Sequence, residues 1–240
     1  ALDDIGSERM TLLWMVDDDA QALVDESGWD GRVEPEPRDT VYVVESNVSP
    51  TSKYNLVVDR TDSLVVTIDD EGNAVSSLRM DWDNRAASNG EPYASLRKFS
   101  NNEDGWYGSY VRVLVPAGAE LVTASGQASE SIRSPESITQ EAGHTSFANY
   151  LFMPPGESSL TYLWTAPGAA KRTDDGWRYE LLLRKQPGAR PMDQTVVVDL
   201  PAGASVTGTA PGAVVEEGRV SFEAPLDADL ELYVEYALSG

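Results

Sequence analysis

The sequence predicts a mainly β protein, built from two antiparallel β-sandwich modules that follow a short α-helical segment. The first observation is a repeat: residues 110–121 (YVRVLVPAGAEL) and 195–206 (TVVVDLPAGASV) both read as an alternating strand, a Pro-Ala-Gly-Ala turn and a second strand. Each copy continues with an acidic turn before a hydrophobic strand, and then with an aromatic-rich strand at 158–166 or 228–236. The second observation is that apolar residues recur with a period of two from Thr40 onward. A repeated set of strands indicates two modules built on one plan.

The segment before the strands predicts two short helices. Ser7 is placed to cap the first helix, and the three aspartates at 17–19 are placed to cap the second, which Gly28 ends. The apolar residues recur at helical spacing and are expected to be buried: Met10, Leu13 and Trp14 in the first helix, and Ala20, Leu23 and Val24 in the second. The aspartates also suggest a cation site, but helix capping is the better interpretation of adjacent acids in this position.

A stiff connector and a run of strands follow. Pro35 and Pro37 forbid helix within 31–39 and favour an extended chain. Strands are then predicted at 40–45, 53–59, 63–69 and 74–82, because these stretches alternate and are rich in β-branched residues. Asp70 to Asn73 reads as a hairpin turn with Gly72 at positive φ. The same acidic cluster resembles a calcium loop, but the alternating ligands and the distant bidentate Glu are missing.

The remaining segments set the predicted domain boundaries. A long polar connection is predicted at 83–109, a Ser- and Glu-rich loop at 125–140, and a linker at 167–175, after which the strand 177–186 opens the second module. We therefore expect a helical segment and Pro-rich connector at 1–38, a larger sandwich at 39–168 and a smaller one at 169–240. Antiparallel modules of this size with short strands are typical of immunoglobulin-like sandwiches.

Composition excludes several classes of function. The 240 residues include 40 acidic and 18 basic side chains, giving a formal charge of −22. This balance opposes binding to nucleic acid and to anionic membranes, because both need Lys and Arg. Cysteine is absent, which removes disulfides, thiol nucleophiles and most structural zinc sites. No apolar run reaches the length of a membrane span.

The sequence contains no recognisable catalytic or metal motif. Nucleotide-binding glycine loops, the Gly-x-Ser-x-Gly elbow and His-Glu-x-x-His are all missing. His144 is the only histidine and lies in a predicted turn, so we expect it to be structural. The carboxylates are too numerous for spacing alone to identify a glycosidase pair. We therefore expect no catalytic residues, no cofactor and no metal site in this chain.

Aromatic residues at the end of the 83–109 connection are the candidate ligand-binding residues. Trp106, Tyr107 and Tyr110 lie beside acidic residues, and aromatic faces next to carboxylates can hold sugar rings. The competing interpretation is core packing, because Tyr110 opens a strand and Trp106 can fix the connection to the sandwich. Burial of the rings of Trp106 and Tyr107 would exclude a carbohydrate platform.

Several stretches together resemble a bacterial envelope family known as domain of unknown function four-zero-one-two. These stretches are DDDAQALVDESGWDG at 17–31, ESNVSPTSKYNLVVDR at 45–60, YVRVLVPAGAEL at 110–121, FMPPGES at 152–158 and YELLLRKQPG at 179–188. The resemblance covers most of the chain and corresponds to the C-terminal part of the family. It implies an exported protein with an N-terminal transmembrane anchor and an upstream half distantly similar to envelope phosphotransferases of the LytR–CpsA–Psr kind. It supplies no catalytic residues.

These observations favour a non-catalytic, extracytoplasmic accessory or interaction module of a membrane-anchored cell-envelope protein. Its expected partner is an envelope glycopolymer or another envelope protein, and the membrane is reached only through an anchor upstream of Ala1. One alternative is that this region completes an envelope glycopolymer phosphotransferase whose catalytic half lies upstream. A second alternative is a carbohydrate-binding module.

Overall fold

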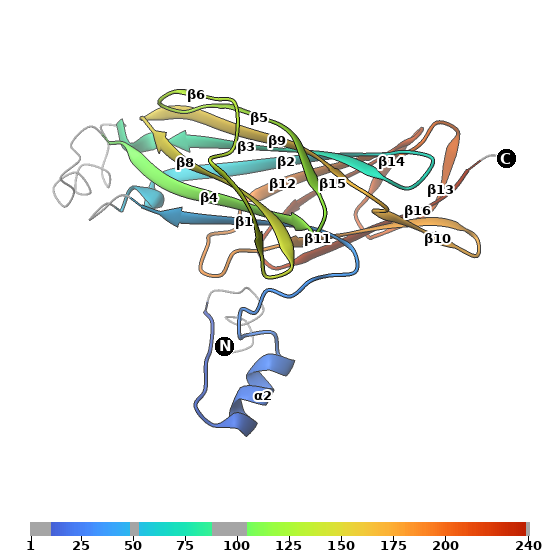
Figure 1. The fold of residues 1–240 in the computed structure, drawn as a ribbon, viewed down its shortest axis with the longest axis horizontal. Helices are drawn as coiled ribbons and strands as arrows, with labels where there is room; N and C mark the ends of the chain where they lie inside the picture. Colours follow the sequence, from blue (N-terminus) through green and yellow to red (C-terminus); the bar gives the residue numbers. More distant parts are fainter. Residues whose placement is uncertain (1–10, 49–52, 88–104, 239–240) are drawn as a thin grey trace.

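The computed structural model describes residues 11–48, 53–87 and 105–238, which form two large β-sheets with one short helix outside them (Figure 1). Strands account for 59% of the chain and helix for 7%. The predicted mainly β fold class is therefore confirmed. No helix among the described residues is long and apolar enough to cross a membrane.

Each sheet contains eight strands. In sheet A the order is β13 (Ala204–Thr209), β16 (Leu230–Leu238), β11 (Gly176–Arg184), β1 (Asp39–Asn47), β4 (Tyr107–Pro116), β8 (His144–Met153) and β7 (Ser137–Glu141), with β10 (Ala170–Thr173) also paired to β11. In sheet B the order is β14 (Val214–Glu216), β15 (Arg219–Pro225), β12 (Asp193–Asp199), β2 (Val58–Ile68), β3 (Ala74–Asn84), β9 (Gly156–Ala166), β5 (Glu120–Gln127) and β6 (Ser131–Ile132).

Strands of the two predicted modules are joined within both sheets. All pairings are antiparallel except two, β1 with β11 and β2 with β12, and each of these parallel pairs joins a strand from before residue 168 to one from after it. Both sheets therefore run continuously from one predicted module into the other. The boundary at 168 stays a prediction.

The two repeated sequence units occupy corresponding places in the strand order. The first unit pairs β4–β8–β7 in sheet A and β5–β9–β3 in sheet B. The second unit pairs β12–β15–β14 in sheet B and β13–β16–β11 in sheet A. Each Pro-Ala-Gly-Ala turn thus carries the chain from one sheet to the other, in opposite directions. The pairing is the same in both units, with the two sheets exchanged.

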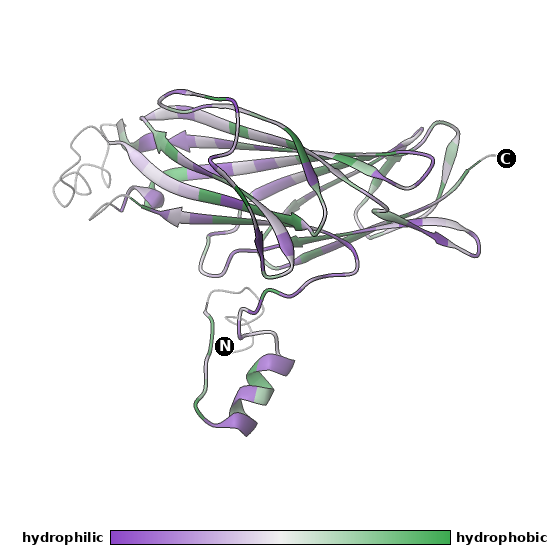
Figure 2. Ribbon diagram, viewed as in Figure 1, coloured by the Kyte–Doolittle hydropathy of each residue, from purple (hydrophilic) through white to green (hydrophobic). Residues whose placement is uncertain are grey.

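The core lies between the sheets. Polar and apolar residues alternate along most strands (Figure 2), so one face of each strand is apolar. Inward-facing residues of both sheets form one hydrophobic cluster. Phe147 of sheet A lies 5.6 Å from Tyr162 and 6.3 Å from Trp164 of sheet B, measured between ring centroids. These aromatic contacts hold the two layers together.

The N-terminal segment contributes α2 (Asp18–Glu26) and a connector along sheet A. Asp17 caps α2 by accepting a hydrogen bond from the backbone N–H of Ala20 at 3.0 Å, which confirms the capping prediction. The connector is held by Arg184, which donates to the carbonyl of Arg32 at 3.2 Å and pairs with Glu36 at 3.5 Å. It therefore covers part of the outer face of sheet A.

Other predictions about the N-terminal segment are wrong. Residues 11–17 are not helical, and Trp14 is 76% exposed because no element packs on it. In α2 only Val24 is buried, while Leu23 is 66% exposed. The predicted helix start at Ser7 and the predicted burial of Met10 lie outside the described residues.

The strand predictions are confirmed for β1, β3 and β11, and the hairpin turn holds Gly72 at φ +82° as expected. The predicted strand at 53–59 is wrong: Tyr54–Leu56 is a 3-10 turn, and β2 runs without a break from Val58 to Ile68. The predicted loop at 125–140 contains β6 and β7, and the predicted linker contains β10. Exposed edge strands lack a buried face, so their sequences do not alternate clearly.

Candidate functional site

The structure separates the three aromatic residues predicted to bind a ligand. Trp106, just before β4, is 36% exposed, and Tyr110 is partly exposed on the outer face of sheet A. Tyr107 points the opposite way, is 3% exposed and donates its hydroxyl to Glu45 Oε1 at 2.9 Å. The burial of Tyr107 removes it from any surface platform. Ligand binding by Trp106 and Tyr110 stays a prediction.

Strand β8 adds two exposed rings to the same face. Tyr150 and Phe152 are 49% and 54% exposed. In the register of β4 and β8, Tyr110 lies opposite Tyr150, and Gly108 lies opposite Phe152. The rings of Tyr110 and Tyr150 are 4.4 Å apart between centroids, at an interplanar angle of 33°. Trp106, Tyr110, Tyr150 and Phe152 are named here the aromatic row.

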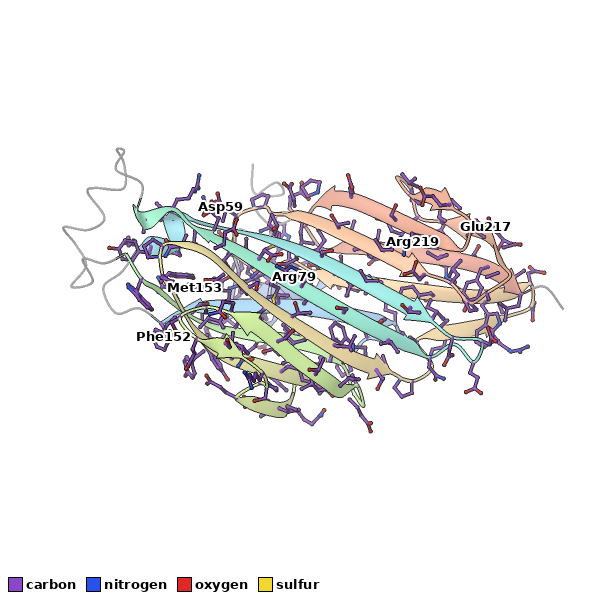
Figure 3. All side chains as sticks on the ribbon, turned by 90° about the horizontal axis from the view of Figure 1, so that it is seen from above. Asp59, Arg79, Phe152, Met153, Glu217 and Arg219 are labelled. Atoms are coloured by element: carbon purple, nitrogen blue, oxygen red, sulfur yellow. The ribbon has the colours of Figure 1, made fainter. Side chains whose placement is uncertain are left out.

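The alternation of β8 exposes these rings. Met153, the residue next to Phe152, is fully buried between the sheets, so the two side chains at this end of β8 lie on opposite faces (Figure 3). Gly108, which lies opposite Phe152 in this register, carries no side chain. The sequence analysis missed Tyr150 and Phe152, although the alternation within ANYLFM at 148–153 was the signal that could have found them.

A second candidate site is a cleft of about 640 Å³ between the ends of β1 and β2 and the loop that joins β11 to β12. Its floor holds Glu45 of β1 and Arg60 of β2, whose side chains are 15% and 8% exposed. Arg60 lies 2.9 Å from Glu45 Oε2 and 3.1 Å from Asp62 Oδ1. Charged side chains are rarely buried to this degree unless they are paired.

Glu45 collects hydrogen bonds from three strands. Trp82 of β3 donates its indole N–H to Oε2 at 3.2 Å, and the Tyr107 hydroxyl donates to Oε1. The side chain of Gln186 is held by both backbone groups of Glu45, accepting from its N–H at 2.8 Å and donating to its carbonyl at 2.9 Å. The loop after β11 is thereby fixed against the end of β1.

The pKa values of two groups near Glu45, the Asp62 carboxyl and the Tyr107 hydroxyl, are both raised, mainly by burial. Burial raises the pKa of Asp62, and the neighbouring Arg60 only partly opposes that rise. The pKa of the Tyr107 hydroxyl is raised by burial and by the Glu45 charge, so Tyr107 stays protonated and acts as a donor. Two carboxylates, those of Glu45 and Asp62, share the one guanidinium of Arg60.

The outer face of sheet B forms a shallow acidic groove of about 570 Å³. Asp59, Asp83 and Glu157 lie directly opposite one another on β2, β3 and β9. Arg85 pairs with Asp59 at 2.7 Å, and Arg79 pairs with Asp81. Asp59 and Arg79 are labelled in Figure 3. Like charges placed opposite each other on a sheet are destabilising, and these arginines offset part of that repulsion.

The acidic clusters considered from the sequence have structural roles. The side-chain amide of Asn73 donates to Asp69 Oδ2 at 2.9 Å and is the main cause of a lowered Asp69 pKa, and the backbone N–H groups of Glu71 and Asn73, at 2.9 and 2.8 Å from Oδ1, lower it further. His144 is 2% exposed, with Nδ1 at 3.0 Å from the carbonyl of Ala142. Within the described ranges, no three His, Asp or Glu side chains are grouped so that they could hold a metal ion.

No protein-family model matches this chain, and no curated protein sequence matches it. A putative nutrient-binding protein from Legionella pneumophila is similar in structure, with a TM-score of 0.48 and 8% identity over 82% of this chain and 71% of that protein. A leukotriene A4 hydrolase from Saccharomyces cerevisiae gives 0.44 and 11% over 81% of this chain and 31% of that enzyme. An M1 zinc metallopeptidase from Deinococcus radiodurans gives 0.36 and 14%, with coverage of 74% and 42%. This chain thus spans less than half the length of the two enzymes, and similarity at this level carries no argument about function.

Proposed function

We propose that this chain is a non-catalytic binding module of a bacterial cell-envelope protein, and that the aromatic row holds the sugar rings of an envelope glycopolymer. The observation that carries the proposal is that Tyr110, Tyr150 and Phe152, all at least partly exposed, lie on one face of two adjacent strands, and that Trp106 is exposed just before β4. Exposed apolar patches on a protein surface mark interaction sites. Aromatic faces combine a large apolar area with a negative quadrupole that attracts polarised C–H groups.

The surroundings of the aromatic row favour a saccharide over a wholly apolar partner. The row is only two strands wide, and Ser46 of β1 lies opposite Tyr110 on its other side. Asn47, next along β1, lies on the opposite face, where its side-chain amide donates to Asn55 Oδ1 at 3.3 Å. The Ser46 hydroxyl beside a line of rings can hydrogen-bond to sugar hydroxyls while the rings stack on the apolar sugar faces.

Binding to purified glycopolymer tests this proposal. Soluble wall polysaccharide is titrated into the protein while tryptophan fluorescence is recorded. If each ring contributes as much as an aromatic pair, about 0.5–1.5 kcal/mol, Trp106→Ala and Tyr150→Ala each weaken binding by about 2- to 12-fold. Trp14→Ala is the matched control, because Trp14 is exposed outside both sheets. Binding that is unchanged in both variants would exclude the aromatic row as the glycan site.

The location in the envelope is proposed from the resemblance of the stretches at 17–31, 45–60, 110–121, 152–158 and 179–188. We also propose that the anchor and the upstream half precede this chain in the whole protein. Fractionation of cells expressing the natural protein tests both points. Recovery of the protein with the membranes, and its cleavage by protease added outside the cells, are expected.

We further propose that the two repeated units arose by duplication of an immunoglobulin-like sandwich. The support is that each unit pairs its strands in the same order while the two sheets are exchanged. A homologue that contains one unit with this strand order would support duplication. A homologue whose two halves have unrelated strand orders would contradict it.

A further inference from the structure

The cleft floored by Glu45 is a site distinct from the aromatic row, and it has the size of a small-molecule site. Ligand pockets are typically about 300–1,000 Å³, and this cleft measures about 640 Å³. It lies where the two predicted modules meet, since β1 and β2 are the strands that form the parallel pairs with β11 and β12.

Most charged side chains of the cleft form ion pairs or hydrogen bonds with neighbouring residues. The acidic side chains outnumber the basic ones there. The guanidinium of Arg60 is shared by Glu45 and Asp62. Arg190 donates to the carbonyls of Asn55 and Val58 at 3.3 and 3.0 Å and lies 3.5 Å from Asp59, so it is bound to the cleft wall. The three carboxylates that line the cleft, those of Glu45, Asp59 and Asp193, outnumber these two arginines.

Two carboxylates in the cleft can accept further hydrogen bonds or form an ion pair. Oε1 of Glu45 accepts one hydrogen bond from the residues that the structure describes, the bond from Tyr107, and a carboxylate oxygen can accept two. Asp193, at the start of β12, is exposed in the cleft and makes no ion pair with any described residue. The net charge of −22 adds a long-range attraction for cations.

Part of the cleft wall is apolar. Leu56, Pro187, Pro191 and Met192 contribute to its lining, and Leu56 is 51% exposed. An aliphatic chain can lie against these side chains while a charged end group reaches the carboxylates. Long cationic side chains bury their methylene stems in this way.

We propose that this cleft binds an alkylammonium group, with the ammonium at Glu45 and Asp193 and the methylene chain against Leu56 and Met192. Either a free diamine or a lysine side chain of a partner protein supplies this chemistry. The carboxylates that line the cleft outnumber its arginines, and the ligand's ammonium pairs with two of these carboxylates. Anionic and neutral ligands gain nothing from this arrangement.

Calorimetric titration of the full chain with 1,5-diaminopentane in 0.15 M NaCl tests the proposal. We expect saturable binding of one molecule per chain, and no binding of 1,5-pentanediol, which has the same length and no charge. Nα-acetyl-lysine amide is titrated in parallel. Tighter binding of this compound than of the diamine assigns the natural ligand to a lysine side chain, and weaker binding assigns it to a free amine.

Three variants separate the site from general attraction by an acidic surface. Glu45→Gln is expected to weaken diamine binding at least tenfold. Asp193→Lys is expected to weaken diamine binding at least fivefold. Asp193 is exposed, so this variant is expected to fold and to provide the test even if Glu45→Gln does not fold. Asp175→Lys, in the exposed turn after β10, changes the net charge as much as Asp193→Lys does and is expected to leave binding unchanged.

The proposal is overturned by any of three results. The first is the absence of saturable binding for both amines at 0.15 M NaCl. The second is equal binding of 1,5-pentanediol. The third is an equal effect of Asp175→Lys and Asp193→Lys, which would show that the diamine responds only to total charge.

Discussion

Asp39→Asn is expected to stabilise the protein at neutral pH, although it replaces a residue with two good hydrogen bonds. Asp39 begins β1, where the connector enters sheet A, and is 3% exposed. Its Oδ2 accepts the hydroxyl of Tyr179 at 2.8 Å, and its Oδ1 accepts the backbone N–H of Thr40 at 2.9 Å. No arginine or lysine forms an ion pair with it among the described residues, so its charge is buried without compensation.

Burial raises the pKa of Asp39 from 3.8 to about 6, with the bonds from Tyr179 and Thr40 opposing the rise. Each pKa unit corresponds to about 1.4 kcal/mol, so ionisation of Asp39 costs the folded state about 3 kcal/mol. The folded pKa lies above the unfolded one. The stabilising effect of the proton is therefore complete below about pH 4 and is lost as the pH rises through 6.

An asparagine at position 39 removes this cost and keeps most of the bonding. Its carbonyl can accept the Thr40 N–H, and its NH₂ can donate to the Tyr179 oxygen. The hydroxyl hydrogen of Tyr179 then loses its acceptor, at a cost of about 1 kcal/mol. The expected net gain in the free energy of unfolding is about 2 kcal/mol at pH 7 and about zero or slightly negative at pH 4.

Urea denaturation of both proteins between pH 4 and pH 8 measures this difference. The other carboxylates titrate in both proteins, so their contributions cancel in the difference between the two free energies. Asp175→Asn is the matched control, because Asp175 is exposed in a turn, and its difference is expected to stay near zero at every pH. A difference for Asp39→Asn that does not change between pH 4 and pH 7 would refute the assignment of a buried, ionised Asp39.

Three further predictions concern the cleft, the glycines and the surface charge. Arg60→Met leaves Glu45 and Asp62 buried without their cation, so urea denaturation at pH 7 is expected to show a loss of about 3–5 kcal/mol. The loss of unfolding free energy is expected to be smaller at pH 5, because the pKa of Asp62 rises further without Arg60 and more of this carboxyl is then protonated. A loss below about 1 kcal/mol at pH 7 would contradict the ion-pair geometry. Gly72→Ala places a Cβ 2.6 Å from the ring of Trp177 and 2.8 Å from the carbonyl of Ala170, whereas Gly118→Ala, at the same φ of +82°, meets nothing within 4 Å. Chemical denaturation is expected to show a loss about 1–3 kcal/mol larger for Gly72→Ala, and equal losses would show that backbone strain alone decides both. Raising NaCl from 0.1 to 1 M shortens the Debye length from about 10 to about 3 Å, so the melting temperature is expected to rise, while calcium chloride at equal ionic strength adds nothing further. A higher melting temperature in millimolar calcium alone would reveal a cation site near Asp17–Asp19 or Asp69–Glu71.

Sequence patterns predicted the strands with one buried face and missed those without one. β3 alternates along its whole length and β11 along its first half, because every second residue there enters the core, and both were predicted. β7 and β14 lie at sheet edges with mostly exposed side chains, so their composition resembles that of loops. The interruption predicted before residue 63 is wrong because β2 carries Asp59, Arg60 and Asp62, which read as a polar turn. Arg60 and Asp62 face inward and pair with each other, and Arg60 also pairs with Glu45 of β1, a contact between strands that a local pattern cannot show.

The candidate sites could be predicted only in part for the same reason. Trp106 and Tyr110 stand out in the sequence because they lie close together after a polar connection. Tyr150 joins them through the register of β4 and β8, which sets residues forty positions apart side by side. The cleft depends on still longer connections, since Gln186 and Glu45 exchange two hydrogen bonds across 141 positions.

Stability does not explain the charged floor of this cleft. Replacing a buried ion pair or triad with apolar residues of similar volume is often neutral or stabilising by about 1–4 kcal/mol. Inward-facing positions in the middle of β1 and β2 are apolar, as Val43 and Leu64 show, so the fold accommodates such residues on these strands. Glu45 and Arg60 replace them where the strands reach the cleft, and Trp82 and Tyr107 both donate hydrogen bonds that hold the Glu45 carboxylate in place. A carboxylate fixed by three strands at the base of a cleft is arranged to meet a cation from outside, and the diamine titration measures whether it does.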